Sequence, residues 1–271
     1  MINKQTCCTG LATRAYCTLL QPFLSLMKLP TIPILWSDEH LIVVNKPSGI
    51  PVLPDRYDPT IPCLWHQLKE TYQYIWVVHR LDKETSGILI FARTKESHQL
   101  LNIQFQNRET LKTYHVLSVS VPNWKTKTVT LPLRPNGDRR HRTVVDTNHG
   151  KSAVTHFNLL QTWKKGYALL EAVPETGRTH QIRIHLASQG ISIIGDILYG
   201  NGQFIYLSSL KPNYTVTHTQ EKPLISRLGL HAFRLIFRHP NTGAMMTCEA
   251  PYPKDFSRVM YQLNKHACGT N

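Results

Sequence analysis

Residues 79–87 read HRLDKETSG and separate two apolar segments, WVV before them and ILIFA after them. Asp82 follows the basic pair His79 and Arg80, so this stretch holds a carboxylate beside cations. A carboxylate can act as a nucleophile, a general base or a metal ligand, and an arginine nearby keeps it ionised and fixes its direction. The same residue types also form ordinary polar turns, so the stretch alone predicts either a turn or a site.

A second group of reactive residue types lies about a hundred residues further along, in ETGRTHQIRIH at residues 175–185. Arg178, His180, Arg183 and His185 gather at a turn and in the first turns of a predicted helix. A helix start with basic side chains can bind an anion, and the alternative is a solvated helix terminus.

The sequence KTYH, residues 112–115, places Lys112 and Tyr114 at the start of a predicted strand. Side chains alternate along a strand, so both residues face the same side of the sheet. A tyrosine and a lysine on one face can stack on a base and contact a phosphate. The alternative is that the tyrosine only packs half-buried.

A third basic segment, RPNGDRRHR at residues 134–142, carries Arg139, Arg140 and Arg142, and Lys151 follows it. Its proline and glycine predict a loop. Such a loop either contacts the phosphates of a nucleic acid or is merely solvated, and the overall charge of the chain favours the phosphate contact.

The composition is that of a basic globular protein. The 271 residues are 41% hydrophobic, which suits one large domain or two joined lobes with a real core. Lysine and arginine number 31 against 17 acids, a net charge of +14, which favours a polyanionic partner such as RNA, DNA or an anionic membrane surface. A merely basic protein without such a partner is the alternative.

The cysteines and acids do not predict a metal site. None of the 6 cysteines forms a CxxC pair or has a histidine at zinc-ligand spacing, so they read as reduced thiols. Asp82 with Glu84 alone is a weak ligand set. We therefore expect no metal.

The termini are expected to lie outside the folded domain. Before Asp38 the chain has basic residues but no acid, and it is rich in Thr and Leu, which resembles a weak organellar transit peptide. We expect residues 1–30 to be an extension, disordered or targeting, residues 31–258 to be the folded domain, and residues 259–271 to be a tail. No run of about 20 apolar residues predicts a membrane span.

The remaining pattern predicts mostly strands with a few helices. Helices are expected at 64–74, from an N-cap at Thr94 to about Asn107, and in THQIRIHLASQG, which ends at Gly190. Strands are expected at about 34–36, 41–44, 76–78, 88–92, 114–121, 153–160, 168–173, 230–237 and 245–250. The regular alternation of a doubly wound fold is missing, so we predict α+β with a mixed, mostly antiparallel sheet.

The order of the motifs resembles one family throughout. HRLDKETSG, KTYHV, GKSAVTHF, ETGRTHQIRIHLASQG, GDILYG and LHAFRLIFRHPNTG follow one another as in the RluA-type RNA pseudouridine synthases. VVNKPSGIPV is similar to the opening segment of that family. The resemblance covers roughly residues 33–256. We expect a branch without an S4-like RNA-binding domain, and LPLRPNGDRRHR followed by GKSAVTHF is most similar to the short bacterial RluA branch.

The resemblance implies a fold, an activity and a central residue. The fold is two fused lobes on a large sheet, with a catalytic cleft. The activity is the conversion of uridine in RNA to pseudouridine without a cofactor or a metal. Asp82 falls on the catalytic aspartate, which acts as a nucleophile or as a base at the sugar, and Arg183 matches a basic residue that pairs with it.

The resemblance also implies substrate-binding residues. Tyr114 matches a tyrosine that stacks on the target uracil and can help to remove its C5 proton, so we predict Asp82, Tyr114 and Arg183 to be catalytic. Arg80 matches an arginine that fills the space left by the flipped-out base. Thr85 shapes the turn that presents Asp82. Apart from the resemblance, we expect substrate contacts from Lys112, Arg178 and His180, because of their residue types and places, and from Arg139, Arg140, Arg142 and Lys151, because of their charge.

The sequence leaves more than one RNA substrate and more than one cellular location open. Large-subunit ribosomal RNA and the tRNA anticodon stem-loop both fit the nearest branch, and we expect a monomer in a bacterial-type cytoplasm or in an organelle. An RNA-binding protein that has lost catalysis and a metal-dependent nuclease are the competing functions. The presence of Asp82, Tyr114 and Arg183 argues against the first, and the missing ligand set argues against the second.

Overall fold

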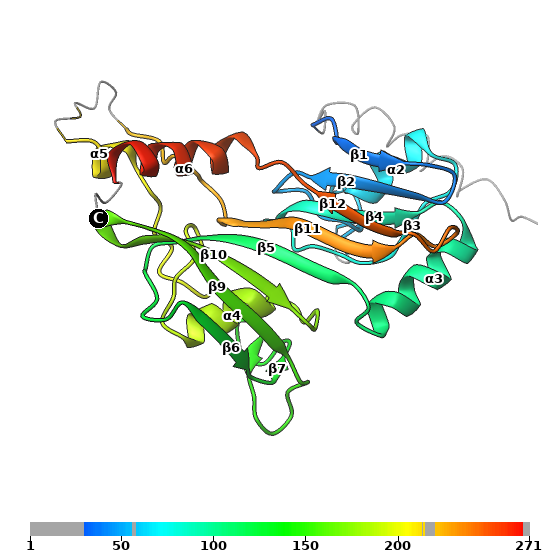
Figure 1. Cartoon of the computed structure of the whole chain (residues 1–271), viewed down its shortest axis with the longest axis horizontal. Coiled ribbons are helices and arrows are strands. Elements are labelled where there is room, and N and C mark those ends of the chain that lie inside the picture. The colour runs from blue at the N-terminus through cyan, green and yellow to red at the C-terminus, as the bar shows by residue number, and fades with distance from the viewer. Residues whose placement is uncertain (1–29, 56–57, 213, 215–219, 268–271) are drawn as a thin grey trace, which may run out of the picture.

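The computed structural model of this chain describes residues 30–55, 58–212, 214 and 220–267 (Figure 1). The extension expected at residues 1–30 lies outside this part except for Pro30. The described residues form one 10-stranded sheet and a separate 2-stranded ribbon, with helices packed on the sheet. The predicted α+β class is confirmed.

The large sheet runs in the order β1-β2-β4-β11-β5-β10-β9-β6, with β3 beside β4 and β12 beside β11. Every pair is antiparallel except β4 with β11, which makes the sheet mixed as predicted. The strands are β1 (Ile34–Ser37), β2 (Leu41–Lys46), β3 (Trp76–Val77), β4 (Ser86–Ala92), β5 (Leu111–Ser118), β6 (Thr126–Thr130), β9 (Val154–Trp163), β10 (Tyr167–Pro174), β11 (Leu230–Arg238) and β12 (Met245–Glu249).

The helices and the small ribbon complete the fold. The helices are α2 (Leu64–Thr71), α3 (Lys95–Gln106), α4 (Gln181–Ser188), α5 (Leu207–Leu210) and α6 (Lys254–His266), with a 3₁₀ turn at Lys164–Gly166. The ribbon consists of β7 (Leu133–Arg134) and β8 (Val144–Val145). The basic segment at 134–142 is therefore the connection of a hairpin.

Local sequence signals explain several of these boundaries. The Thr94 side chain accepts a hydrogen bond from the Ser97 backbone N–H at 3.1 Å, so α3 has the predicted N-cap. Gly190 adopts a φ of 72° just after α4, where a helix commonly ends in the left-handed region. β4 is buried along its whole length, which matches its unbroken apolar sequence.

The sheet has one lobe at each end, and each lobe buries side chains on both faces of the sheet. In the first lobe β2 and β4 separate a cluster under α2 from a cluster under α3. In the second lobe α4 covers one face and α6 covers the other (Figure 1). The two lobes share β5 and β11, so the segments between them meet at the middle of the sheet.

The expected boundary at residue 258 is wrong. Helix α6 continues to His266, and its Phe256, Val259 and Leu263 side chains are buried in the core of the second lobe. Residues 259–266 are thus part of the folded domain. The signal was present as an apolar repeat at helical spacing, and only packing against α5 and the sheet made it decisive.

In the part of the chain that the structure describes, no helix is long and apolar enough to cross a membrane.

Candidate active site

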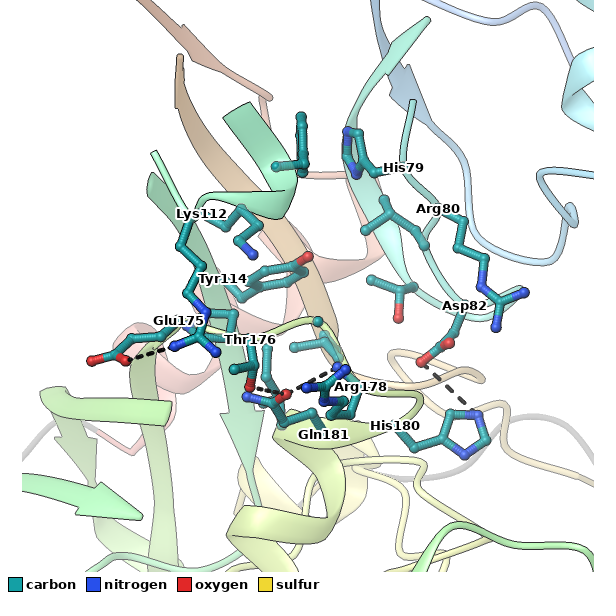
Figure 2. Close-up of a pocket in the computed structure, with 18 of the residues that line it drawn as sticks. His79, Arg80, Asp82, Lys112, Tyr114, Glu175, Thr176, Arg178, His180 and Gln181 are labelled. Carbon is teal, nitrogen blue, oxygen red and sulfur yellow. Dashed lines mark hydrogen bonds and ion pairs between the residues drawn. The ribbon is translucent and has the colours of Figure 1, made fainter. Parts of the chain in front are cut away.

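The three residues predicted to be catalytic line one cavity of about 530 Å³ between the two lobes. Most of its lining comes from three segments: the loop before β4, the end of α3 with β5, and the turn after β10 with the first residues of α4. Asp82 comes from the first segment, Tyr114 from the second and Arg183 from the third, and Figure 2 shows Asp82, Tyr114 and His180 around the cavity. The structure therefore brings together all three residues predicted to be catalytic.

The loop that carries Asp82 is held from beneath by a buried lysine. The Lys46 ammonium donates to the carbonyl oxygens of Pro47, Ile50 and Lys83 at 2.8–3.0 Å. Burial lowers the pKa of Lys46 to about 7, while the carboxylates of Glu84 and Asp82 oppose that shift. Since Lys83 directly follows Asp82, this contact fixes the backbone beside the carboxylate.

Two further features fix the same loop to β4. The His79 ring accepts a hydrogen bond from the Ile90 backbone N–H at 3.1 Å and stacks on Phe105. Burial lowers the pKa of His79 to about 3, so the ring is neutral and serves as an acceptor. Gly87 closes the motif because β11 passes close by, and a Cβ there would overlap the backbone carbonyl of Ala232.

Asp82 faces the cavity and has one basic neighbour. The distance from its carboxylate to His180 Nε2 is 3.9 Å, and among the described residues no other basic group comes within the 4.0 Å of an ion pair. His180 stands just before α4 with a φ of 55°, which directs its ring across the cavity (Figure 2). Arg80 is exposed at the rim beside Asp82.

The predicted pairing of Arg183 with Asp82 is wrong. Arg183 makes a two-pronged ion pair with Asp196, at 2.8 Å from Nε and 2.6 Å from Nη2. Both side chains are almost fully buried, and the Tyr199 ring lies 5.0 Å from the guanidinium carbon. The turn after α4 brings Asp196 closer to Arg183 than the loop of Asp82 comes, so the guanidinium is already neutralised.

Tyr114 and Lys112 both line the cavity, as the strand period predicted. Burial, and then the negative charge of Asp82, raise the pKa of Tyr114, which keeps its phenol protonated. Burial, and then Arg108, lower the pKa of Lys112. Both groups thus sit where water is partly excluded, as a base-stacking wall requires.

The turn before α4 is built by its own side chains. The side-chain amide oxygen of Gln181 accepts hydrogen bonds from the Thr176 hydroxyl at 2.7 Å and from the Arg178 backbone N–H at 3.0 Å. Arg178 also donates from Nε to the Ser152 carbonyl at 3.1 Å and lines the cavity. His185 points elsewhere, since its ring contacts Thr155 and the Leu131 carbonyl.

Thr85 also lines the cavity, but its hydroxyl is buried and makes no hydrogen bond with the described residues. The expectation that it shapes the turn agrees with its backbone, because the Thr85 N–H donates to the Asp82 carbonyl at 3.1 Å.

The basic hairpin does not line this cavity. Arg139 and Arg140 are exposed, as is Lys151, which extends the ribbon by bridging to Leu133. Arg142 differs because it pairs with Asp138 at 2.7 Å and donates to the Leu198 carbonyl at 3.1 Å. Its guanidinium therefore holds the hairpin against the β-turn after α4, and the expected phosphate contact fits Arg139 and Arg140 better.

Sequence reasoning missed Lys46, Asp196 and Tyr199. Lys46 lies in VVNKPSGIPV and Asp196 and Tyr199 lie in GDILYG, and both motifs had been noted without a role for these residues. A lysine inside an apolar strand and an aspartate beside a buried segment were the available signals, because such charges are rarely buried without partners.

Comparisons with known proteins agree on the class. The family described as RNA pseudouridylate synthase matches residues 40–188. The dual-specificity RNA pseudouridine synthase RluA of Haemophilus influenzae is 34% identical over 221 residues, 82% of this chain and 93% of that protein. The ribosomal large subunit pseudouridine synthase D of Zymomonas mobilis is 34% identical over 242 residues, 86% of this chain and 73% of that protein.

Among solved structures, human RNA pseudouridylate synthase domain containing 4 superposes with a TM-score of 0.66 at 24% identity, covering 93% of this chain and 98% of that one. This likeness supports the fold. The sequence matches show that the chain belongs to the RluA-type RNA pseudouridine synthases, a family of RNA-modifying isomerases.

Proposed function

We propose that this enzyme isomerises uridines in structured RNA with Asp82 as its catalytic group and without a cofactor or a metal. The observation that carries the proposal is the convergence of Asp82 and Tyr114 on one cavity with basic residues at its rim. Three segments far apart in the chain supply these groups.

Asp82 acts at the sugar of the target nucleotide. The bond between N1 of uracil and C1′ of ribose breaks, the uracil turns, and C5 bonds to C1′. The C5 proton is lost to water and N1 gains a proton in exchange, so the product is an isomer of the substrate. Asp82 serves either as the nucleophile on C1′ or as the base that takes a ribose proton, and both routes need an ionised carboxylate beside a sugar that gains positive character.

Tyr114 stacks on the uracil. Its ring faces the cavity from β5, and its raised pKa keeps the phenol protonated at neutral pH. A protonated phenol is a poor base, so the geometry favours stacking over removal of the C5 proton. Lys112, on the same face of β5, lies near enough to the cavity to contact a phosphate or the base.

Arg80 and the basic hairpin grip the RNA. A uridine inside a stem reaches Asp82 only by leaving the stack, which costs a few kcal/mol. The exposed Arg80 guanidinium can fill the vacated space and so offset part of that cost. Arg139, Arg140 and Lys151 then hold the backbone together with Arg178 and His180 at the cavity wall.

The substrate is large-subunit ribosomal RNA, the tRNA anticodon stem-loop, or both, since the names of the two relatives refer to ribosomal RNA and to dual specificity. The enzyme acts as a monomer in a bacterial-type cytoplasm or in an organelle.

Tritium release from RNA labelled at C5 of uridine tests this function. Wild type and Asp82→Asn are assayed with bulk tRNA and with protein-free ribosomal RNA, each in EDTA. Release by wild type alone supports the proposal, and the RNA that responds identifies the substrate class. Release that EDTA abolishes contradicts the metal-free mechanism, and equal release by Asp82→Asn contradicts the role of Asp82. Tight RNA binding without release from either RNA favours a binding protein.

A further inference from the structure

Among the described residues, His180 is the basic side chain within ion-pair distance of Asp82, whereas Arg183 is paired with Asp196. The His180 Nε2 atom lies 3.9 Å from the Asp82 carboxylate, which is within ion-pair range and longer than a hydrogen bond. Its other ring nitrogen, Nδ1, lies 2.9 Å from the Tyr199 hydroxyl. The imidazole therefore stands between the carboxylate and a phenol.

The Tyr199 hydroxyl is the hydrogen-bond partner of Nδ1 of His180. Its oxygen accepts a hydrogen bond from the Thr143 backbone N–H at 3.0 Å. If the phenol donates its own proton to Nδ1, that nitrogen is the unprotonated one. The proton of a neutral His180 is then on Nε2, the nitrogen that faces Asp82.

Electrostatics favour the same arrangement. The charged or titratable groups around the ring are Asp82 and Arg80 from the first segment, Arg183 from α4, and Asp196 and Tyr199 from the turn after it. Burial is the main cause that lowers the pKa of His180, with Asp82 opposing it, so the ring is neutral at neutral pH. An Nε2 lone pair would repel the carboxylate, whereas an Nε2 proton attracts it.

We propose that His180 is a positioning residue for Asp82, whose Nε2–H closes on the carboxylate and aims it at the sugar once RNA fills the cavity. This inference rests on the proposed function of the cavity. Hydrogen bonds of this kind are often long in a free enzyme and shorten in the complex. Thr143 belongs to the basic hairpin, so the element proposed to grip the RNA is connected to His180 through the Tyr199 hydroxyl.

Two substitutions of His180 test the roles of its two ring nitrogens separately. The amide of asparagine falls near Nδ1, so His180→Asn keeps the contact with Tyr199 and loses the reach to Asp82. The amide of glutamine falls near Nε2, so His180→Gln keeps an N–H donor toward Asp82. The backbone φ of 55° suits asparagine better than glutamine, so strain alone would harm the glutamine variant more.

Steady-state tritium release gives kcat and KM for each variant on the responsive RNA. We expect His180→Asn to lower kcat by about 10- to 100-fold, the cost of a misaimed reacting group. KM should change far less, because the other basic residues proposed to hold the RNA backbone are still present. His180→Gln should restore most of that loss. The control is His149→Asn, whose side chain is 79% exposed, and it should match wild type.

Several results would overturn the inference while leaving the function standing. These are an unchanged kcat in His180→Asn, equal losses of kcat in both variants, or a rise in KM alone. If wild type releases no tritium, the proposed function itself fails.

A second readout does not depend on activity. Nitrogen-15 NMR of histidine rings should show His180 protonated on Nε2 in wild type, and Tyr199→Phe should shift it toward a mixture of tautomers. Protonation on Nδ1 in wild type would contradict the inference even if the enzyme is active.

Discussion

The partner of Arg183 can be identified by comparing the stabilities of Asp196→Asn and Asp82→Asn. In Asp196→Asn the side chain keeps its shape, and its oxygen can still accept from the Leu198 and Tyr199 backbone N–H groups, both now at 3.0 Å. The charge opposite Arg183 is lost, together with the hydrogen bond from Arg183 Nε, because the amide nitrogen cannot accept it. Removing one partner of a buried ion pair typically costs about 3–5 kcal/mol, because the other charge is left buried.

Asp82→Asn should be nearly neutral for stability. The Asp82 side chain is 30% exposed, and its nearest basic side chain is the neutral His180 ring at 3.9 Å, so we expect a change of less than about 1 kcal/mol. For a chain of this size, the loss in Asp196→Asn corresponds to a melting temperature lower by about 6–20 °C.

The assay is urea unfolding of wild type and both variants at neutral pH, with the m-values compared to confirm that the folded states are equally compact. A larger loss in Asp82→Asn than in Asp196→Asn would refute the assignment and restore the pairing of Arg183 with Asp82. Circular dichroism of the folded variants serves as the control for misfolding.

The same ion pair predicts a pH dependence. Burial acts to raise the pKa of Asp196, but the hydrogen bonds and charge of Arg183 outweigh it and lower that pKa below its ordinary value. A lowered pKa stabilises the fold above the unfolded value of about 4 and loses that contribution as the pH falls through the folded value. The difference in unfolding free energy between wild type and Asp196→Asn should therefore be constant from about pH 5 to 8 and become smaller at acidic pH.

Three more predictions follow from the loop and the hairpin. The double variant Arg139→Glu and Arg140→Glu should weaken RNA binding and reduce the slope of its salt dependence by the equivalent of about 1–2 phosphate contacts. Lys254→Glu with Lys265→Glu, at two exposed positions of α6, should leave both the affinity and the slope unchanged. Between about pH 7 and 10.5 the folded Lys46 is neutral while the unfolded lysine is still charged, so the free energy of unfolding of wild type should rise with pH in this range. Lys46→Met should remove that rise. Parallel curves of unfolding free energy against pH for the two proteins would contradict the burial of a titrating lysine. Thr85→Val should stabilise the fold by up to about 1 kcal/mol in urea unfolding, because it removes a buried hydroxyl without a partner, and a loss of that size would show that the hydroxyl is satisfied.

The sequence by itself determined the class, most of the elements and the motif that carries Asp82, the residue proposed to be catalytic. Apolar alternation and turn residues located the strands, and Thr94 and Gly190 marked helix ends, because these signals act within a few residues of the chain. The motif containing Asp82 and the one containing Arg183 were readable for the same reason. The net charge of +14 indicated the polyanionic partner without any structure.

Only the tertiary structure decided which charges meet. Arg183 is near Asp82 in the cavity, but the turn after α4 brings Asp196 within 2.6 Å of its guanidinium, and distance and burial decide an ion pair. Lys46 became a support for the catalytic loop only because β2 ends beneath Lys83. Helix α6 joined the core because its apolar face found a partner. These outcomes depend on contacts between residues distant in sequence, which a local pattern cannot fix.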